Sequence, residues 1–329
     1  MILDISRHKF YEALIMLLII TTITVAGAFA LGDEMATATI ATTSPIAESI
    51  MGWCVNHPTL TALALIPIFI NISLSLARAT VRTSLYPNSS LAAISLIALA
   101  VMGTAITTSY PIAILTTLFT AQCLARLLYC FGPNKRLNKL YTAMLAAGVL
   151  PLLDGAMASI SIIIFIFIAL QRGTARESII ALGGLLLPTF VCSYIYWLTG
   201  ESFIDTSLNI WHAATNLGDI TELVDYITPP RLILLGYMLF MYLITSFYYL
   251  GGQTSFNNLA RAAWPMLHIV SISSVAITIF IPSAAQSLLC CATISVATML
   301  PLMHQRIGDM WSAVSYIAFI CLSIYSLWG

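Results

Sequence analysis

Charged residues are scarce in this sequence. Only 8% of its 329 residues are Asp, Glu, Lys or Arg, while 60% are hydrophobic and the mean hydropathy is +0.95. A soluble domain of this length would need far more charge on its surface. The formal net charge is zero, so overall charge gives no reason to expect a nucleic-acid partner. The composition therefore excludes a soluble domain and predicts a membrane protein.

Motifs that carry chemistry are also lacking. The sequence has no Walker loop, dinucleotide fingerprint, zinc signature or nucleophile elbow, so no cofactor is identified. Its seven cysteines form no metal-ligand spacing and lie mostly in apolar runs, and we interpret them as small core residues. The first apolar segment, 10–31, is longer than the core of a signal peptide, so we expect a retained helix and no cleavage.

Long apolar runs are what the sequence does contain. They are continuous and of helix length, which predicts an all-α, polytopic transmembrane bundle forming a single membrane domain over 1–329. About eleven spans are predicted, near 11–31, 58–77, 89–107, 110–129, 138–154, 155–170, 178–199, 232–250, 264–284, 286–303 and 308–327. Spans 138–154 and 155–170 are close to the lower limit of about 17 residues. Segment 138–170 therefore either crosses twice or forms a re-entrant hairpin, which would leave nine crossings.

The division of charge between the two sides predicts the orientation. With the N-terminus inside and the C-terminus outside, twelve of the thirteen basic residues fall inside and only Arg231 falls outside. Nine of the thirteen acidic residues fall outside. This pattern favours a bacterial inner membrane, with the acidic face toward the periplasm or the exterior.

Two predicted outer loops are long enough to hold structure, 32–57 and 201–230. Each carries apolar residues at helical spacing: Ile46, Ile50 and Trp53 in the first, and Ile204, Leu208 and Trp211 in the second. The second loop breaks at 216–218 and restarts with a capping-box-like pattern at 219–222. We predict short amphipathic helices on the membrane surface. The alternative is that these segments only cover the outer surface of the bundle.

Asp33 and Glu34 are the candidate catalytic residues. They follow the outer end of the first span and precede the first surface helix. A carboxylate at the boundary of water and lipid can act as a general base toward a hydroxyl acceptor, or hold a divalent metal ion against a lipid phosphate. Solvated residues at the end of a loop are the alternative interpretation.

Three further residues are candidates for substrate binding. Asp154 lies in a very short outer turn, where it is close enough to the boundary to reach water. Trp211 and His212 lie on a predicted surface helix, where they could stack on a sugar or bind it, although a lone histidine there is more often a surface residue. No metal site is predicted from histidine or cysteine clusters.

Gly183 and Gly184 predict a close helix contact. Small residues let the backbones of two membrane helices approach each other, and the nearby Pro188 loosens the local helix hydrogen bonding. We predict that both glycines lie against another helix.

Residues 140–200 carry a recognisable order of features. They read LYTAMLAAGVLPLLDGAMASISIIIFIFIALQRGTARESIIALGGLLLPTFVCSYIYWLTG: a small-residue segment, a short acidic turn, an aliphatic helix, an arginine loop and a Gly-Leu-Leu-Pro helix ending in aromatic residues. This order resembles an uncharacterised family of multi-pass inner-membrane proteins from Bacteroidota. The resemblance implies a location and no specific activity.

The layout is also similar, more distantly, to membrane-embedded glycosyltransferases that use polyisoprenyl-phosphate sugars. In those enzymes an acidic residue shortly after the first helix serves catalysis. The resemblance makes Asp33 its counterpart, with Glu34 as the alternate, and a polyisoprenyl-phosphate-linked substrate the expected partner beside membrane lipids. The segment after Glu34 departs from that pattern, because it reads Met-Ala-Thr-Ala-Thr.

Three functions follow as hypotheses. The first is handling of a lipid-linked sugar or other envelope precursor at the outer leaflet, by a glycosyltransferase-like enzyme. The second is transport of a small molecule or lipid, and the third is a non-catalytic assembly subunit of an envelope complex. Transport predicts buried polar residues near the membrane midplane, whereas envelope chemistry predicts acidic residues around an outer-facing groove.

Overall fold

Every regular element of the described structure is helical. The computed structural model describes residues 10–32, 45–87, 90–131, 137–172, 174–200, 202–215, 220–252 and 256–328. The elements are α1 (Phe10–Ala30), α2 (Pro45–Asn56), α3 (Pro58–Arg82), α4 (Ala92–Ala105), α5 (Tyr110–Cys130), α6 (Leu137–Leu153), the 3-10 turn η3 (Gly155–Met157), α7 (Ala158–Arg172), α8 (Ala175–Leu198), α9 (Phe203–Thr215), α10 (Ile220–Tyr226), α11 (Pro229–Gly251), α12 (Asn258–Phe280), the 3-10 turn η5 (Pro282–Ala284), α13 (Ala285–Met299), α14 (Pro301–Arg306) and α15 (Asp309–Leu327).

Each of the eleven predicted spans overlaps a helix, and span 286–303 covers nearly all of α13 together with the first residues of α14. Eight stretches of the described chain are long and apolar enough to cross a membrane by length and composition. The other three, α4, α6 and η3 with α7, are apolar but shorter. The all-helical prediction is confirmed. These features are those of a multi-pass membrane protein.

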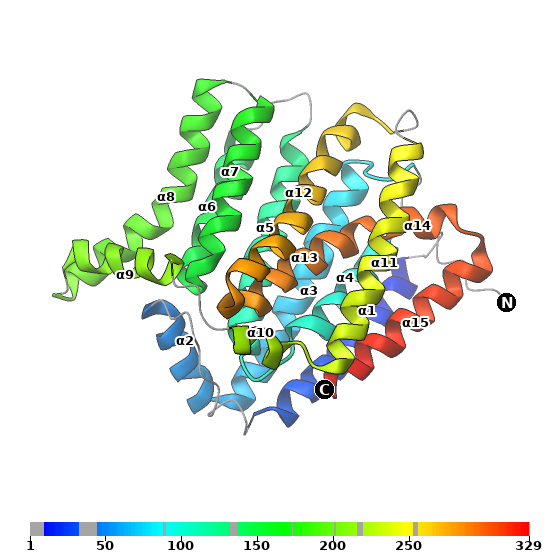
Figure 1. Cartoon of the computed structure of the whole chain (residues 1–329), viewed down its shortest axis with the longest axis horizontal. Coiled ribbons are helices and arrows are strands. Elements are labelled where there is room, and N and C mark those ends of the chain that lie inside the picture. Colours follow the sequence, from blue (N-terminus) through cyan, green and yellow to red (C-terminus); the bar gives the residue numbers. More distant parts are fainter. Residues whose placement is uncertain are drawn as a thin grey trace.

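Two short helices, α4 and α13, form the centre of the bundle (Figure 1). Every residue of α4 is buried, and in α13 only Gln286 is partly exposed. The two helices pack against each other and are contacted by α1, α3, α5, α11, α12 and α15. Helix α8 lies at the periphery, where it packs on α6 and α7.

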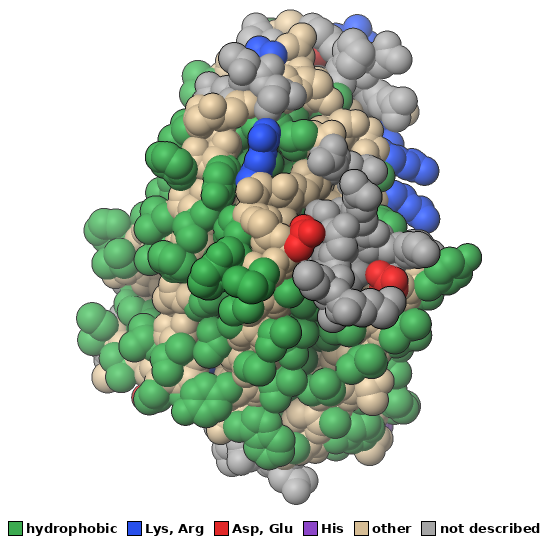
Figure 2. All heavy atoms as spheres, turned by 90° about the vertical axis from the view of Figure 1, so that its right-hand side faces the viewer, with side chains coloured by type: hydrophobic (Ala, Val, Ile, Leu, Met, Phe, Trp, Pro, Cys, Tyr) green, Lys and Arg blue, Asp and Glu red, His purple; other side chains and the backbone are tan. Residues whose placement is uncertain are grey.

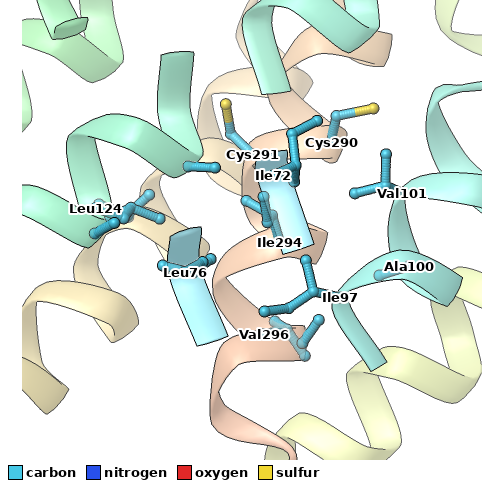
Figure 3. Close-up of a cluster of buried hydrophobic side chains, with 14 of the residues drawn as sticks. Ile72, Leu76, Ile97, Ala100, Val101, Leu124, Cys290, Cys291, Ile294 and Val296 are labelled. Atoms are coloured by element: carbon cyan, nitrogen blue, oxygen red, sulfur yellow. The ribbon is translucent and has the colours of Figure 1, made fainter. Parts of the chain in front are cut away.

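Aliphatic side chains fill the space between the central helices and their neighbours. Figure 3 shows Ile97 of α4 near Ile294 of α13, with Leu76 from α3 and Leu124 from α5 beside them. Six of the seven cysteines are buried and all are free, in agreement with their interpretation as core residues. The exception is Cys321, which is exposed on α15.

Basic side chains gather at one end of the bundle, which we call the basic end. Figure 2 shows them in the upper part of the molecule, above a surface dominated by hydrophobic side chains. In the described chain they are Arg78, Arg82, Arg126, Lys139, Arg176, Arg261 and Arg306, where α3, α5 and α14 end and α6, α8 and α12 begin. Arg231 lies at the opposite end, which we call the α10 end.

The predicted surface helices are present as α2, α9 and α10. Helix α2 packs against α5 and α6, and its buried face consists of Ala47, Met51 and Cys54. On α9 the apolar residues Ile204 and Leu208 are 67% and 46% exposed, so they point away from the bundle. An exposed apolar stripe on a short helix is suited to contact with lipid. That these helices lie on a membrane surface remains a prediction.

The predicted glycine contact is confirmed for Gly184 and wrong for Gly183. A Cβ at Gly184 would lie 2.7 Å from the Tyr141 carbonyl oxygen of α6, while one at Gly183 would have no atom within 4 Å. Neighbouring positions on an α-helix point about 100° apart because a turn holds 3.6 residues. The rotation of α8 therefore turns Gly184 toward α6 and leaves Gly183 facing away from it.

Candidate functional site

Of the site residues predicted from the sequence, the structure brings the turn of Asp154 into contact with α9, the helix that contains Trp211 and His212. Asp33 and Glu34 lie outside the described residues, so their proposed catalytic role remains a prediction. Trp211 is part of α9, but its side chain is outside the description as well, and His212 is exposed on the same helix. Asp154 is buried in the turn between α6 and α7, and this turn contacts α9.

Asp154 acts as the cap of the short turn η3. Its Oδ1 accepts a hydrogen bond from the Ala156 backbone N–H at 3.2 Å. The side chain is only 5% exposed, because α9 packs over η3. A capping carboxylate satisfies a backbone donor that would otherwise lack a partner. Asp154 therefore has a structural role, and its proximity to α9 is compatible with the predicted binding role.

Helix α4 ends inside the protein, so its last carbonyl groups need hydrogen-bond donors from outside the helix. Its 14 residues span about 21 Å at 1.5 Å per residue, less than a hydrocarbon layer of about 30 Å. The last carbonyl groups of a helix have no partner within the helix, and in a membrane interior water cannot supply one. The end of α4 therefore needs donors from other elements.

Four side chains from four other elements cap the successive carbonyl groups of 103–106. The donors are Ser326 Oγ of α15 at 2.6 Å, Tyr226 Oη of α10 at 2.9 Å, Gln286 Nε2 of α13 at 3.1 Å and Arg231 Nη2 of α11 at 3.4 Å. Each of these four atoms donates to a different one of the four carbonyl groups. The end of α4 is thus the meeting point of the elements at the α10 end.

Gln286 also holds the turn that joins α4 to α5. Its Nε2 donates to Thr107 Oγ1 at 2.7 Å, and its Oε1 accepts from Ser109 Oγ at 2.5 Å. Both ends of the amide are used, so Gln286 fixes the position of the turn relative to α13.

Arg231 is the charged side chain among the four that cap the end of α4. It is 8% exposed, its Nη1 donates to the Tyr226 carbonyl at 3.2 Å, and its guanidinium lies 5.5 Å from the centre of the Tyr226 ring. Its Nε is buried without a hydrogen-bond partner, and no carboxylate among the described residues pairs with it. The nearby helix ends supply only partial negative charge. A buried cation of this kind is costly unless an anion accompanies it.

Other buried donors at the α10 end also lack partners among the described residues. They are Thr228 Oγ1 before α11, Ser283 Oγ in η5 and Tyr110 Oη at the start of α5. Burial raises the pKa of the Tyr226 hydroxyl well above its usual range, so this group stays protonated and donates. Folded proteins leave few buried polar atoms unpaired. The α10 end therefore holds several buried hydroxyl groups, besides the Arg231 guanidinium, whose hydrogen bonds are not satisfied within the described residues.

We define the Arg231 cluster as Arg231, Tyr226, Gln286 and the turn 106–109. Such a set of donors around a cation is suited to binding an anion, because guanidinium matches carboxylate and phosphate oxygens geometrically. Among the described residues no group of three or more His, Cys, Asp or Glu side chains is placed to hold a metal ion. The expectation of a divalent metal rests on Asp33 and Glu34 and remains a prediction.

In the sequence, Arg231 stands out only as the one basic residue that falls on the predicted outer side. That exception was the available signal, because an isolated basic residue at the acidic side of a membrane protein needs a reason to be there. Its burial and its role at the end of α4 depend on contacts between residues more than a hundred positions apart.

Comparison of the chain with known protein families, curated proteins and solved structures found no match. The resemblances to a Bacteroidota membrane-protein family and to polyisoprenyl-phosphate-dependent glycosyltransferases therefore remain predictions.

Proposed function

We propose that this chain is a bacterial inner-membrane protein that binds the anionic head group of a lipid-linked sugar or other envelope precursor at the outer leaflet. The observation that carries the proposal is Arg231, a buried guanidinium with an unpaired Nε and no described carboxylate partner. A phosphate would supply both the missing acceptor and the missing negative charge.

The proposed orientation places the basic end in the cytoplasm and the α10 end outside. Positive charge on the cytoplasmic side is the general rule for membrane proteins, and it supports an N-terminus inside and a C-terminus outside. Eleven crossings are favoured over nine because the turn η3, between α6 and α7, contacts η5 and α9. The hairpin thus reaches the same end as the connection between α12 and α13.

Lipid would reach the site along the surface helices. Ile220 and Val224 of α10 are 67% and 66% exposed, while Tyr226 of the same helix belongs to the Arg231 cluster. An apolar exposed face on a helix at the membrane boundary favours contact with acyl chains. Helix α10 therefore offers a short path from the lipid surface to Arg231.

A glycosyltransferase-like reaction would need a general base in addition to the anion site. Asp33 and Glu34 are the proposed candidates, with Trp211 and His212 as sugar contacts. Replacing a general base typically costs about 10²-fold to 10⁴-fold in rate. Asp33→Asn and Glu34→Gln should then abolish complementation while the protein still inserts into the membrane. If both variants complement fully, the chain binds the precursor without reacting it, as an assembly subunit would.

The anion site is tested by measuring binding of a polyisoprenyl phosphate to the protein in nanodiscs by native mass spectrometry. Arg231→Gln should weaken binding about tenfold or more, because a charge-assisted hydrogen bond contributes about 1.5–3 kcal/mol. Arg231→Lys should lose less, since it keeps the positive charge. The uncharged polyisoprenol should bind equally to all variants.

Arg78→Gln is the matched control, because Arg78 is an exposed arginine at the basic end. It should leave binding unchanged. Folding of each variant is checked by its melting temperature. A folded Arg231→Gln protein that binds the phosphate as tightly as the parent would contradict the proposal.

Transport is the second candidate, and the short central helices favour it. Helices that end within the bundle often form substrate sites in transporters, and α4 ends in this way next to α13. A transporter must expose its centre to water during its cycle. Cys290 of α13 should then react with a membrane-impermeant thiol reagent when substrate is present. Complete protection of Cys290 with every candidate substrate would count against transport.

A further inference from the structure

Asn71 of α3 and Gln122 of α5 form a hydrogen-bonded amide pair on the outer surface of the bundle. Gln122 Nε2 donates to Asn71 Oδ1 at 2.5 Å, Asn71 is exposed and Gln122 is half-buried. At 1.5 Å per residue, Asn71 lies about 20 Å along the helix from Pro58 and about 10 Å from Arg78. Both ends of α3 are therefore too far away for the short Asn71 side chain to reach the water beyond them.

The surface around the pair is apolar. Leu60, Leu63, Ala64 and Pro67 are exposed at the helical spacing that continues to Asn71, and we call these five residues the α3 face. The neighbouring stripe of α5 is half-buried and consists of Leu115, Leu118 and Phe119, followed by Gln122. The amide pair is thus a polar point on a surface otherwise suited to lipid.

The pair leaves one donor group and one acceptor without partners. No described residue bonds Asn71 Nδ2 or Gln122 Oε1. Hydrocarbon offers neither donors nor acceptors, so these groups remain unsatisfied as long as lipid covers them. Leucine at both positions would be the favourable choice for a surface that only meets lipid. The amides point to a protein neighbour at this depth.

We propose that the α3 face and the amide pair are the contact surface for a second copy of this chain. The free groups are self-complementary, because a donor on α3 and an acceptor on α5 lie side by side. A two-fold axis along the membrane normal would bring Asn71 Nδ2 of each copy to Gln122 Oε1 of the other. Asn and Gln side chains bond across membrane helices in this way. The inference is independent of the proposed anion site.

The first test counts subunits in liposomes by single-molecule photobleaching at a series of protein-to-lipid ratios. At a high protein-to-lipid ratio, each fluorescent spot should contain two copies of the parent protein. The double variant Asn71→Leu, Gln122→Leu should need a surface density about tenfold higher or more, because two symmetry-related hydrogen bonds are lost. Gln171→Leu, which removes an exposed amide at the basic end of α7, should behave as the parent does.

The second test does not depend on removing the amides. Ala64→Cys in a Cys321→Ser background should form a disulfide-linked or bismaleimide-linked dimer, because Ala64 lies on the α3 face. Ile179→Cys on the exposed surface of α8 is the control and should link far less. A parent protein that is monomeric at every density would overturn the proposal, as would equal dimerisation of the double variant. Linking of Ala64→Cys in native membranes only to a different protein would also overturn it.

Discussion

At Gly184 the backbones of α6 and α8 approach so closely that a single methyl group has no space. A Cβ there would lie 2.7 Å from the Tyr141 carbonyl oxygen and 3.1 Å from Met144 Cβ. On the facing helix, a Cβ at Gly148 would collide with the Leu185 backbone carbonyl. Close packing through small residues is one source of attraction between helices in lipid. The two glycines therefore set the distance between α6 and α8.

We expect Gly184→Ala to destabilise the protein by about 1–3 kcal/mol, the usual cost of forcing an extra methylene into a packed site. Gly183→Ala is a control of the same chemistry one residue away, where a Cβ meets nothing. It should be neutral or slightly stabilising, because alanine favours a helix over glycine by about 0.5–1 kcal/mol. Thermal unfolding in detergent measures both. Equal melting temperatures for the two variants would contradict the close crossing of α6 and α8.

Helix α4 shows how an element can be stabilised by its neighbours more than by its own sequence. It is short, wholly buried and has no basic residue in its last turn. Its C-terminal carbonyl groups are paired with side chains of α10, α11, α13 and α15. These donors join segments that are far apart in the sequence, so the end of α4 couples the positions of four helices.

Gln286→Met should destabilise the protein, because the apolar replacement removes the donor to the Ala105 carbonyl and both bonds that tie the Thr107 and Ser109 hydroxyls to α13. Leaving a buried polar group unsatisfied costs about 1–3 kcal/mol. Gln171→Met at the exposed end of α7 removes one glutamine hydrogen bond from a solvated position and should cost far less. The measurement is again thermal unfolding in detergent. A melting temperature for Gln286→Met equal to that of Gln171→Met would show that this cap contributes little.

For the whole molecule, the separation of charge between the two ends determines which way it should insert. The described lysines and arginines lie at the basic end, apart from the buried Arg231. Moving such a cluster across a membrane is opposed by the rule that positive charge stays in the cytoplasm. The basic end and the α10 end should therefore lie on opposite sides of the membrane.

Single cysteines introduced at Asn209, which is exposed, and at Ser178, which is half-buried, test this orientation. In intact cells an impermeant maleimide should label Asn209→Cys on α9 but not Ser178→Cys near the start of α8. Permeabilisation should then allow labelling at Ser178→Cys. The reverse pattern would show that the basic end is outside, and the site would then face the cytoplasm.

Much of the fold could be predicted from the sequence because each membrane helix must satisfy its own backbone. The predicted apolar runs are helical for this reason, and the apolar stripes that begin at Ile46 and Ile204 lie on the short helices α2 and α9. The separation of charge is equally local information, since it requires only the order of the spans. Hydropathy did not show that α4 and α13 are central, because apolar side chains face lipid and protein equally well.

Only the tertiary structure decided which residues meet. Gly183 and Gly184 are equivalent in the sequence, yet the rotation of α8 places only Gly184 against α6. Arg231 is only an exception to the charge pattern in the sequence, yet in the structure it is buried and donates to a carbonyl 125 positions away at the end of α4. Asn71 and Gln122 lie in different predicted spans, and the packing of α3 on α5 joins them by a hydrogen bond at the outer surface of the bundle. Hydrophobicity alone determined that these segments are membrane-type helices. Packing set the rotation and length of each helix, and these determined which side chains meet in the Arg231 cluster and in the Asn71–Gln122 pair.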